Sequence, residues 1–277
     1  MLLFNNKIDL IKNLSLVNER TIGFVPTMGG LHDGHLKLIQ ESKKKCDITV
    51  CSIFINPTQF NNLEDFSKYP SSLDNDLEKL KAIDCDIVYN PPATDLYEYK
   101  ISSKQFDFGA LTNYMEGKFR PGHFNGVATI VEKLFNIINP SIAFFGEKDL
   151  QQLQIIKALV KNMKSNIHVQ SVSTVRESNG LAKSTRNKRL SKNGRDEAAE
   201  IYKCLVYCKK NKHNGISQLK KYVLQRLTNN KNIELEYLEF VDLENMTPIK
   251  KWKGTNKNAI CIAAYHSGIR LIDNIIL

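Results

Sequence analysis

The stretch VPTMGGLHDGH, residues 25–35, places three glycines and two histidines within seven residues, directly after a short apolar run. That run, residues 22–26, ends at a proline and predicts a β-strand. Glycines let the backbone approach a ligand closely, and a helix beginning near His35 would present N–H groups and the positive end of its dipole to an anion. His32 and His35 would share one helix face. Two interpretations stay open: a phosphate-binding strand-to-helix turn, or a tight turn with incidental histidines.

Strand and helix patterns alternate from this stretch to about residue 175. After the helix at 35–45, the predicted strands cover 48–55, 86–89, 142–145 and 167–172. The predicted helices cover 73–82, 127–138 and 150–163. Residues 48–55, ITVCSIFI, are apolar almost throughout, as expected of a strand buried on both faces. Such alternation is typical of right-handed βαβ units, so we predict an α/β fold with a Rossmann-like, doubly wound parallel sheet.

The pattern changes near residue 175. Helices are predicted at 195–210 and 216–227, followed by strands at 233–242, 259–265 and 269–273. The tripeptide His266-Ser267-Gly268 indicates a hairpin turn between the last two strands. We therefore predict a first domain at 1–175 and a smaller C-terminal α+β domain at 176–277.

The composition is that of an ordinary globular protein, with 42% hydrophobic and 25% charged residues among 277. No apolar run reaches about 18 residues, and the N-terminal MLLFNNKIDL has no basic region before its short apolar stretch. We therefore expect no membrane segment, no signal peptide and a cytoplasmic location. The six cysteines form no C-x-x-C pair, and we expect free, mostly buried thiols.

The net charge of +10 raises the possibility of a basic nucleic-acid-binding protein, which is a different class of function. However, 31 of the 39 basic residues are scattered lysines, whereas specific nucleic-acid surfaces rely more on arginine. The sequence shows neither a clustered basic face nor interleaved aromatic residues. We expect a solvated, lysine-rich surface and no nucleic-acid partner, although the charge also suits anionic small molecules such as nucleotides.

Polar sequence follows three of the predicted strands. PTMGGLHDGH follows the first, NPTQF (56–60) the second, and GEKDLQQ (146–152) the strand at 142–145. Ligands of doubly wound sheets bind beyond the carboxyl ends of the strands, so these three ends are expected to converge on one crevice. The Lys148 ammonium suits a phosphate, and Asp149 would cap the following helix or bind a ribose or metal.

These motifs resemble those of a known family. The pattern H-x-G-H after a strand is similar to the signature of the HIGH-type nucleotidyltransferases, and the longer PTMGGLHDGH resembles the pantoate–β-alanine ligase (pantothenate synthetase) family. Further motifs agree and stand in the family's order: FINPTQF (54–60), EGKFRPGHFNGVATIVEKLFNIINP (116–140), FFGEKDLQQL (144–153), STRN (184–187) and RLIDN (270–274). The resemblance covers nearly the whole chain.

The resemblance implies a ligase reaction. The pantoate carboxylate attacks the α-phosphorus of ATP to give pantoyl adenylate and pyrophosphate, and the β-alanine amine then attacks the acyl carbon to give pantothenate and AMP. Mg²⁺ would accompany ATP, and the protein would be a homodimer. Because the substrates supply both reacting groups, the protein has to align two anions, neutralise phosphate charge and exclude water.

The resemblance also implies the site residues. His35, Lys148 and Arg186 would be catalytic. Gln59 and Gln152 would hold pantoate, with Gln59 also receiving β-alanine, because an amide both donates and accepts hydrogen bonds. Residues 1–175 would bind nucleotide and pantoate, and 176–277 would act as a lid. The implied ATP-binding residues are Met28, Gly29, Gly30, Leu31, His32, Asp33, Gly34, His35, Gly146, Glu147, Lys148, Asp149, Val175, Lys183, Ser184, Thr185 and Arg186.

The chain departs from the family pattern at four positions, Gly30, Ser71, Lys183 and Thr185, where the family more often has Ala, Arg, Met and Ser. Two roles also stay open. Arg120 would either contact an anion or brace its loop, and residues 183–189 would either contact phosphate or form an ordinary solvated loop. Another HIGH-type adenylyltransferase is the alternative function, although such enzymes lack NPTQF and GEKDLQQ together.

Overall fold

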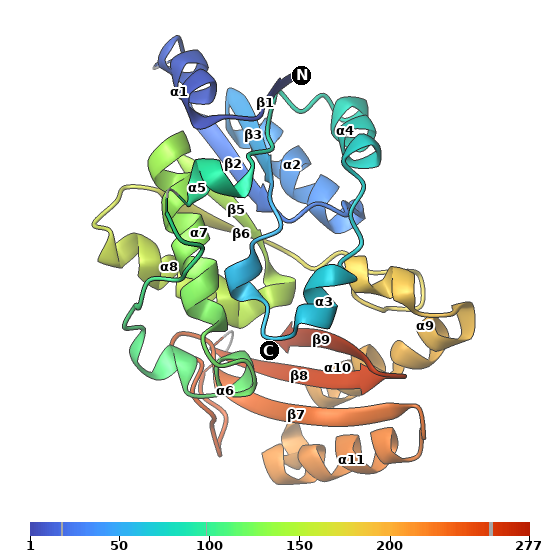
Figure 1. Ribbon diagram of the computed structural model, residues 1–277. Coiled ribbons are helices and arrows are strands. Elements are labelled where there is room, and N and C mark those ends of the chain that lie inside the picture. The colour runs from blue at the N-terminus through green and yellow to red at the C-terminus, as the bar shows by residue number, and fades with distance from the viewer. Residues whose placement is uncertain (18, 98, 255–256) are drawn as a thin grey trace. The chain divides into compact units, whose positions relative to one another are not determined.

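The structure, a computed structural model, describes residues 1–17, 19–97, 99–254 and 257–277 and divides into two compact units (Figure 1). Unit 1 consists of Met1–Phe108, Arg120–Glu147 and Ile155–Ser173. Unit 2 consists of Gly109–Phe119, Lys148–Gln154 and Thr174–Leu277.

Unit 1 contains, within the described residues, a sheet of six strands that pair in parallel in the order β1-β4-β3-β2-β5-β6. The order reverses at β2, which lies between β3 and β5, so the carboxyl ends of β2 and β5 form the switch point at which such sheets bind ligands. The strands are β1 (Leu2–Phe4), β2 (Ile22–Thr27), β3 (Ile48–Ile53), β4 (Ile87–Tyr89), β5 (Ile142–Gly146) and β6 (His168–Val172).

Helices cover both faces of this sheet. Val25 of β2 lies in one buried cluster with Ile39 of α2 (Asp33–Lys45) and Leu80 of α4 (Leu73–Ala82). Phe24, the preceding residue, packs edge-on against Phe135 of α7 (His123–Ile138), with ring centroids 6.2 Å apart. Because successive strand residues point to opposite faces, α2 and α4 cover one face and α7 the other. The predicted doubly wound parallel sheet is confirmed.

Two elements at the start of the chain were not predicted from the sequence pattern. β1 has only three residues, too few for a hydrophobic period to be visible. Helix α1 (Lys7–Ser15) begins after Asn6, whose side chain accepts the Asp9 N–H at 2.9 Å as an N-cap. The remaining helices outside Thr174–Leu277 are α3 (Leu63–Ser67), α5 (Ala93–Leu96), α6 (Met115–Phe119) and α8 (Leu150–Asn162), with the single turns η1 (Pro57–Gln59), η2 (Gly109–Thr112) and η3 (Glu147–Asp149).

Unit 2 is built on an antiparallel sheet that has, in the described part of the chain, the order β7-β8-β9. Its strands are β7 (Ile233–Asp242), β8 (Asn258–His266) and β9 (Ile269–Ile276), which confirms the predicted C-terminal α+β fold. Ser267 and Gly268 both have positive φ, 48° and 77°, as a two-residue hairpin turn requires. The helices within Thr174–Leu277 are α9 (Lys192–Ala198), α10 (Glu200–Lys210), α11 (Ile216–Thr228), η4 (Thr185–Arg189) and η5 (Lys212–Asn214).

The single helix predicted at 195–210 is wrong, because the structure has two helices, α9 and α10. The side chain of Ser191 accepts the Gly194 N–H at 3.0 Å and starts α9 before the predicted boundary. Ala199 then separates the helices, and its N–H bonds to the carbonyls of both Arg195 and Glu197.

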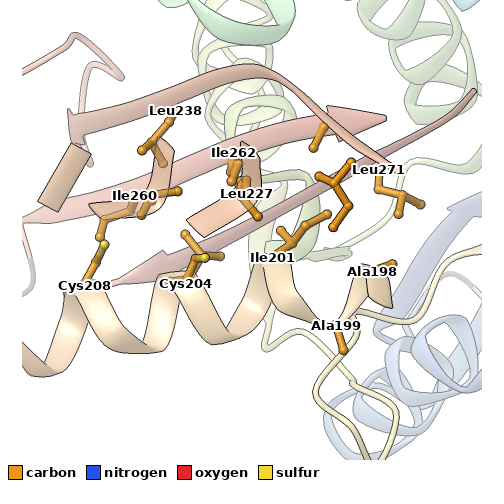
Figure 2. Close-up of a cluster of buried hydrophobic side chains, with 14 of the residues drawn as sticks. Ala198, Ala199, Ile201, Cys204, Cys208, Leu227, Leu238, Ile260, Ile262 and Leu271 are labelled. Carbon is orange, nitrogen blue, oxygen red and sulfur yellow. The ribbon is translucent and has the colours of Figure 1, made fainter. Parts of the chain in front are cut away.

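The core of unit 2 lies between α10 and the antiparallel sheet. Figure 2 shows Ile201, Cys204 and Cys208 on one side of α10, pointing towards strand residues such as Ile260 and Ile262. Burial raises the pKa of Cys204 to about 12 and that of Cys208 to about 11, so both remain thiols. All six cysteines lie within the described residues and are free, and five of them are buried, as predicted.

Candidate active site

The turn after β2 is held by a carboxylate from helix α4. Gly29 and Gly30 have φ values of 76° and 64°, in the left-handed region that glycine adopts readily. The N–H groups of Gly30 and Leu31 each donate to one carboxylate oxygen of Asp76, both at 2.7 Å. Lys79, one turn further along α4, donates to the Leu31 carbonyl at 2.7 Å. Side chains of α4 therefore bind the turn on both sides of Leu31.

His32 and His35 form a stacked pair at the start of α2, with ring centroids 4.1 Å apart. His32 Nδ1 accepts the Gly34 N–H at 3.1 Å, and His35 Nδ1 lies 3.4 Å from the His32 main-chain nitrogen. Because Nδ1 is the acceptor in each ring, a neutral ring carries its proton on Nε2. Both imidazoles can therefore donate a hydrogen bond through Nε2.

Helix α2 begins at Asp33, two residues before the predicted start. The expectation that its first N–H groups would face a ligand is wrong for two of them. The Gly34 N–H bonds to His32 Nδ1, and the His35 N–H bonds to the His32 carbonyl at 2.8 Å. At this turn, the donors that suit an anion are the imidazoles rather than these backbone groups.

The loop after β3 lies beside the turn after β2. Gln59 Nε2 is 2.8 Å from the Met28 sulfur, so residues from both strand ends meet within unit 1. Asn56 is buried and links the loop to α7, because its Nδ2 donates to the Gly126 carbonyl at 3.0 Å. Tyr97 donates to Asn56 Oδ1 at 2.7 Å. Asn56 thus anchors the loop that carries Gln59.

Arg120 and His123 both contact the main chain of Gln59. Arg120 Nη2 donates to the Gln59 carbonyl at 3.1 Å, and His123 Nδ1 lies 2.8 Å from the same oxygen. Arg120 Nη1 is 3.1 Å from His123 Nε2. Because arginine only donates hydrogen bonds, Nε2 is the acceptor of the His123 ring and Nδ1 is the donor. The structure shows Arg120 as a brace, and its contact with an anion stays a prediction.

The segment after β5 enters unit 2 at Lys148, and its two adjacent glutamines differ in role. Gln151 is buried; its Oε1 accepts the Glu116 N–H at 2.9 Å and its Nε2 donates to the Leu111 carbonyl at 2.7 Å. Gln152 is half-buried and keeps more of its surface exposed. The Lys148 carbonyl accepts Asn274 Nδ2 at 2.8 Å. The segment is therefore fixed by residues distant in sequence.

The loop at 183–186 is joined to Val175 within unit 2. The Lys183 N–H donates to the Val175 carbonyl at 2.9 Å, next to a bridge between Arg176 and Ala182. Arg176 forms a double hydrogen bond to Asp273, at 2.6 and 2.9 Å. Burial raises the pKa of the Asp273 carboxyl, and the Arg176 guanidinium opposes this shift.

A buried ion-pair network connects α6 to the C-terminal sheet. Arg270 donates to both oxygens of Glu116, at 2.7 and 2.8 Å, and also to Glu236. Tyr237 donates to Glu116 at 2.9 Å, and the Arg270 side chain is only 18% exposed. Because carboxylates buried without a cation are costly, this network holds the 109–119 segment against β7 and β9.

The predicted site residues thus fall into two sets. In unit 1, Met28 contacts Gln59, and His32 stacks on His35. Gly146 is the last residue of β5, the strand next to β2, and Glu147 follows it. In unit 2, hydrogen bonds link Lys183 to Val175 and Ser184 to Arg186, while Lys148, Asp149, Gln152 and Thr185 belong to the same unit.

Asp76, His123 and Asn274 hold predicted site residues in place, although no sequence pattern indicates a role for them. Asp76 stands three residues after the predicted start of α4, where an acidic residue is common at any helix N-terminus. His123 and Asn274 lie inside quoted motifs, but their partners are distant in sequence. A local pattern carries no signal for these contacts.

Across the described residues, no group of three or more His, Cys, Asp or Glu side chains is placed to hold a metal ion. No described helix has the length and apolar content needed to cross a membrane.

Comparison with known proteins gives one consistent result. The family model described as "Pantoate-beta-alanine ligase" matches residues 4–276. The pantothenate synthetase of Flavobacterium psychrophilum is 46% identical over 281 aligned positions, covering all of both chains. Pantothenate synthetase from Thermus thermophilus superposes with a TM-score of 0.93 at 33% identity, covering 100% of this chain and 99% of that one. The pantoate-beta-alanine ligase of Francisella tularensis, solved with beta-gamma ATP and beta-alanine, has a TM-score of 0.84 at 35% identity, with coverage of 100% and 97%.

Proposed function

Because the chain belongs to the pantoate–β-alanine ligase family, it joins pantoate to β-alanine to give pantothenate, and we propose that ATP drives this condensation through a pantoyl adenylate. The observation that carries the proposal is the stacked His32–His35 pair at the carboxyl end of β2, the switch-point strand, in a chain matched by the family from residue 4 to residue 276.

The proposed reaction has two steps. A carboxylate oxygen of pantoate forms a bond to the α-phosphorus of ATP, and the bond to the bridging oxygen breaks to release pyrophosphate. The β-alanine nitrogen then bonds to the acyl carbon, AMP leaves with the carboxylate oxygen, and the amine loses a proton. No covalent enzyme intermediate is needed, so the protein acts by alignment and charge stabilisation.

We assign the two imidazoles to the phosphates of ATP. The hydrogen-bond pattern at Nδ1 leaves Nε2 as the donor in both rings, and a phosphate oxygen is a strong acceptor. His35 is the proposed catalytic residue of the pair, since a donor at the α-phosphate would stabilise the charge that develops there. The rest of Met28–His35, together with Gly146 and Glu147, would line the nucleotide.

Lys148 and Arg186 are the proposed cations for the phosphates. A lysine ammonium serves as a point charge, while an arginine guanidinium can contact two oxygens of the leaving pyrophosphate. Ser184 accepts the Arg186 N–H at 3.3 Å and starts the single turn η4, which fixes the backbone from which Arg186 extends. Asp149, Val175, Lys183 and Thr185 would complete the nucleotide contacts.

We assign Gln59 and Gln152 to pantoate, and Gln59 also to β-alanine. The buried anchor at Asn56 and the Arg120–His123 contacts with the Gln59 main chain keep the Gln59 backbone in one position. The half-buried Gln152 stands next to Gln151, whose amide is already used within unit 2. An amide pairs with hydroxyl and carboxylate groups without adding a competing charge.

Mg²⁺ would enter with ATP rather than occupy a protein cage, since Mg²⁺ usually binds through phosphates and one or two carboxylates. The donor set fits this mode, because the Asp149 side chain is 45% exposed. The ion would supply charge neutralisation on the phosphates. A lid role for 176–277, nucleotide and pantoate binding by 1–175, a homodimer and a cytoplasmic location complete the proposal.

The remaining alternative is another HIGH-type adenylyltransferase, which would transfer AMP to an acceptor other than pantoate. Product analysis separates the two functions. We expect AMP and pyrophosphate in a ratio of one to one, formed in sustained turnover only when both pantoate and β-alanine are present. ADP as the product, or turnover without pantoate, would contradict the proposed function.

Three variants test the assigned residues. His35→Ala, Lys148→Ala and Arg186→Ala should each lower the rate of adenylation by about a hundredfold or more, as loss of one transition-state donor does. Lys157→Ala, an exposed lysine on α8, is the matched control. Wild-type rates in a folded His35→Ala protein would remove that residue from the mechanism.

A further inference from the structure

Helix α4 places a buried carboxylate under the turn that we assign to ATP. Asp76 is 1% exposed, and each of its two oxygens accepts one main-chain N–H, from Gly30 and from Leu31, at 2.7 Å. Hydrogen bonds to an ionised carboxylate are among the stronger ones in proteins. The two bonds span neighbouring peptide groups and fix their orientation.

The backbone of the turn is shaped to accept this carboxylate. Gly29 has a φ of 76°, and a Cβ built on it would stand 2.9 Å from Asp76 Oδ2. The space that a side chain would fill at Gly29 is therefore taken by the carboxylate. Lys79 adds a third contact from the same helix, to the Leu31 carbonyl at 2.7 Å.

This contact changes how the turn can bind an anion. Successive N–H groups in a glycine turn form a concavity that commonly binds phosphate. Here the N–H groups of Gly30 and Leu31 bind the protein's own carboxylate. These two N–H groups are therefore already used, and the next hydrogen-bond donors along the chain are the imidazoles of His32 and His35.

We propose that Asp76 is a positioning residue for ATP, which holds the 29–31 turn so that His32 and His35 direct Nε2 to the phosphates. This inference rests on the proposed function, because it takes the ATP site to be at Met28–His35. Asp76 does not itself touch the nucleotide. It acts through the main chain that leads directly into the histidine pair.

Asp76→Asn tests the contact with little change in shape. One amide oxygen can still accept an N–H, but the amide nitrogen faces the other N–H donor, so one of the two bonds is lost. We expect the KM for ATP in pantoate-dependent pyrophosphate exchange to rise about tenfold, the size of effect of one charge-assisted hydrogen bond. The KM for pantoate should change by less than about twofold, a ratio that a merely structural role would not produce.

Asp74→Asn is the matched control, because Asp74 stands in the same first turn of α4 and is exposed. It makes the same change in net charge and in helix-dipole interaction, and it should leave both KM values unchanged. Lys79→Met supplies a second test, since it removes the Leu31 carbonyl contact and keeps the carboxylate. Lys79→Met should raise the KM for ATP by a smaller factor. Because it leaves the buried carboxylate in place, it also provides a folded variant in case Asp76→Asn does not fold.

His35→Ala, measured alongside, distinguishes the two proposals. If His35→Ala is impaired while folded Asp76→Asn and Lys79→Met both keep the wild-type KM for ATP, the positioning role is contradicted and the proposed site stands. If His35→Ala itself has wild-type exchange, the ATP site is not at this turn and both proposals fail. A selective rise in the KM for ATP in Asp76→Asn, absent from Asp74→Asn, is the supporting result.

Discussion

The glycine turn of unit 1 and the Lys148–Gln152 segment of unit 2 both carry predicted ATP or pantoate contacts, but they are held in different ways. Two neighbouring N–H groups of the turn bind the two oxygens of one carboxylate, that of Asp76. The unit 2 segment is held at separate points, by Asn274 at the Lys148 carbonyl and by the Glu116 N–H at the Gln151 amide. Its partners come from widely separated parts of the sequence.

Because the two segments are held differently, changes in them should have different consequences. A change at the turn alters the orientation of a few peptide groups and should affect ATP contacts with little loss of stability. The unit 2 segment depends on a shared core, in which Arg270 joins Glu116 to the C-terminal sheet. Changes there should affect stability first.

The largest effect is expected from Arg270→Met. It leaves the Glu116 and Glu236 carboxylates without their cation, at positions where both side chains are largely buried. We expect the free energy of unfolding to fall by about 3–5 kcal/mol, measured by urea denaturation. Arg226→Met is the control, because the Arg226–Glu200 pair lies at the surface with a half-exposed arginine, and it should be close to neutral. Similar losses in both variants would contradict the importance of the network.

Gly126→Ala should have the next largest effect, within unit 1. A Cβ at Gly126 would stand 2.2 Å from the Thr58 carbonyl and 2.8 Å from the Gln59 nitrogen. The Gln59 loop must then move, with a loss of about 1–3 kcal/mol in stability and a rise in the KM for pantoate. Steady-state kinetics and denaturation measure both quantities. Asn136→Ala, at an exposed position of α7, is the control. An unchanged KM for pantoate would show that this close approach does not position Gln59.

Asn274→Ala should have a smaller effect, because it removes a single hydrogen bond, from Asn274 Nδ2 to the Lys148 carbonyl. We expect a loss of about 1 kcal/mol in stability, together with slower pyrophosphate exchange. Asn211→Ala removes a comparable bond, from Asn211 Nδ2 to the Tyr207 carbonyl at 2.9 Å, and should leave exchange unchanged. Equal exchange rates in the two variants would mean that Asn274 does not position Lys148.

The smallest effect is expected from alkylation of the native protein at pH 8. The pKa of Cys204 is raised to about 12 and that of Cys208 to about 11 by burial, so almost no reactive thiolate forms there. Half-buried Cys46 should react first, with activity retained. Peptide mass spectrometry measures the order of labelling, and rapid modification of Cys204 would show that the core of unit 2 opens readily.

The sequence was informative wherever the structure depends on local pattern. The spacing of apolar residues and the placement of glycine and proline predict the strand at 22–26, the histidine pair after it and the helix at 73–82. The structure contains all three. The carboxylate beneath the turn could not be predicted, because Asp76 resembles any acidic residue of a first helical turn. The Gln59 brace and the Asn274 contact depend on partners 61 to 126 residues away, for which periodicity gives no information.

Exchange of labelled pyrophosphate into ATP in the absence of β-alanine shows whether the protein forms a pantoyl adenylate. A pantoyl adenylate forms before β-alanine reacts, so exchange should require pantoate and ATP alone, and folded His35→Ala should be strongly impaired. If the wild-type protein shows no exchange until β-alanine is added, or if ADP is formed, the chain does not react through a pantoyl adenylate.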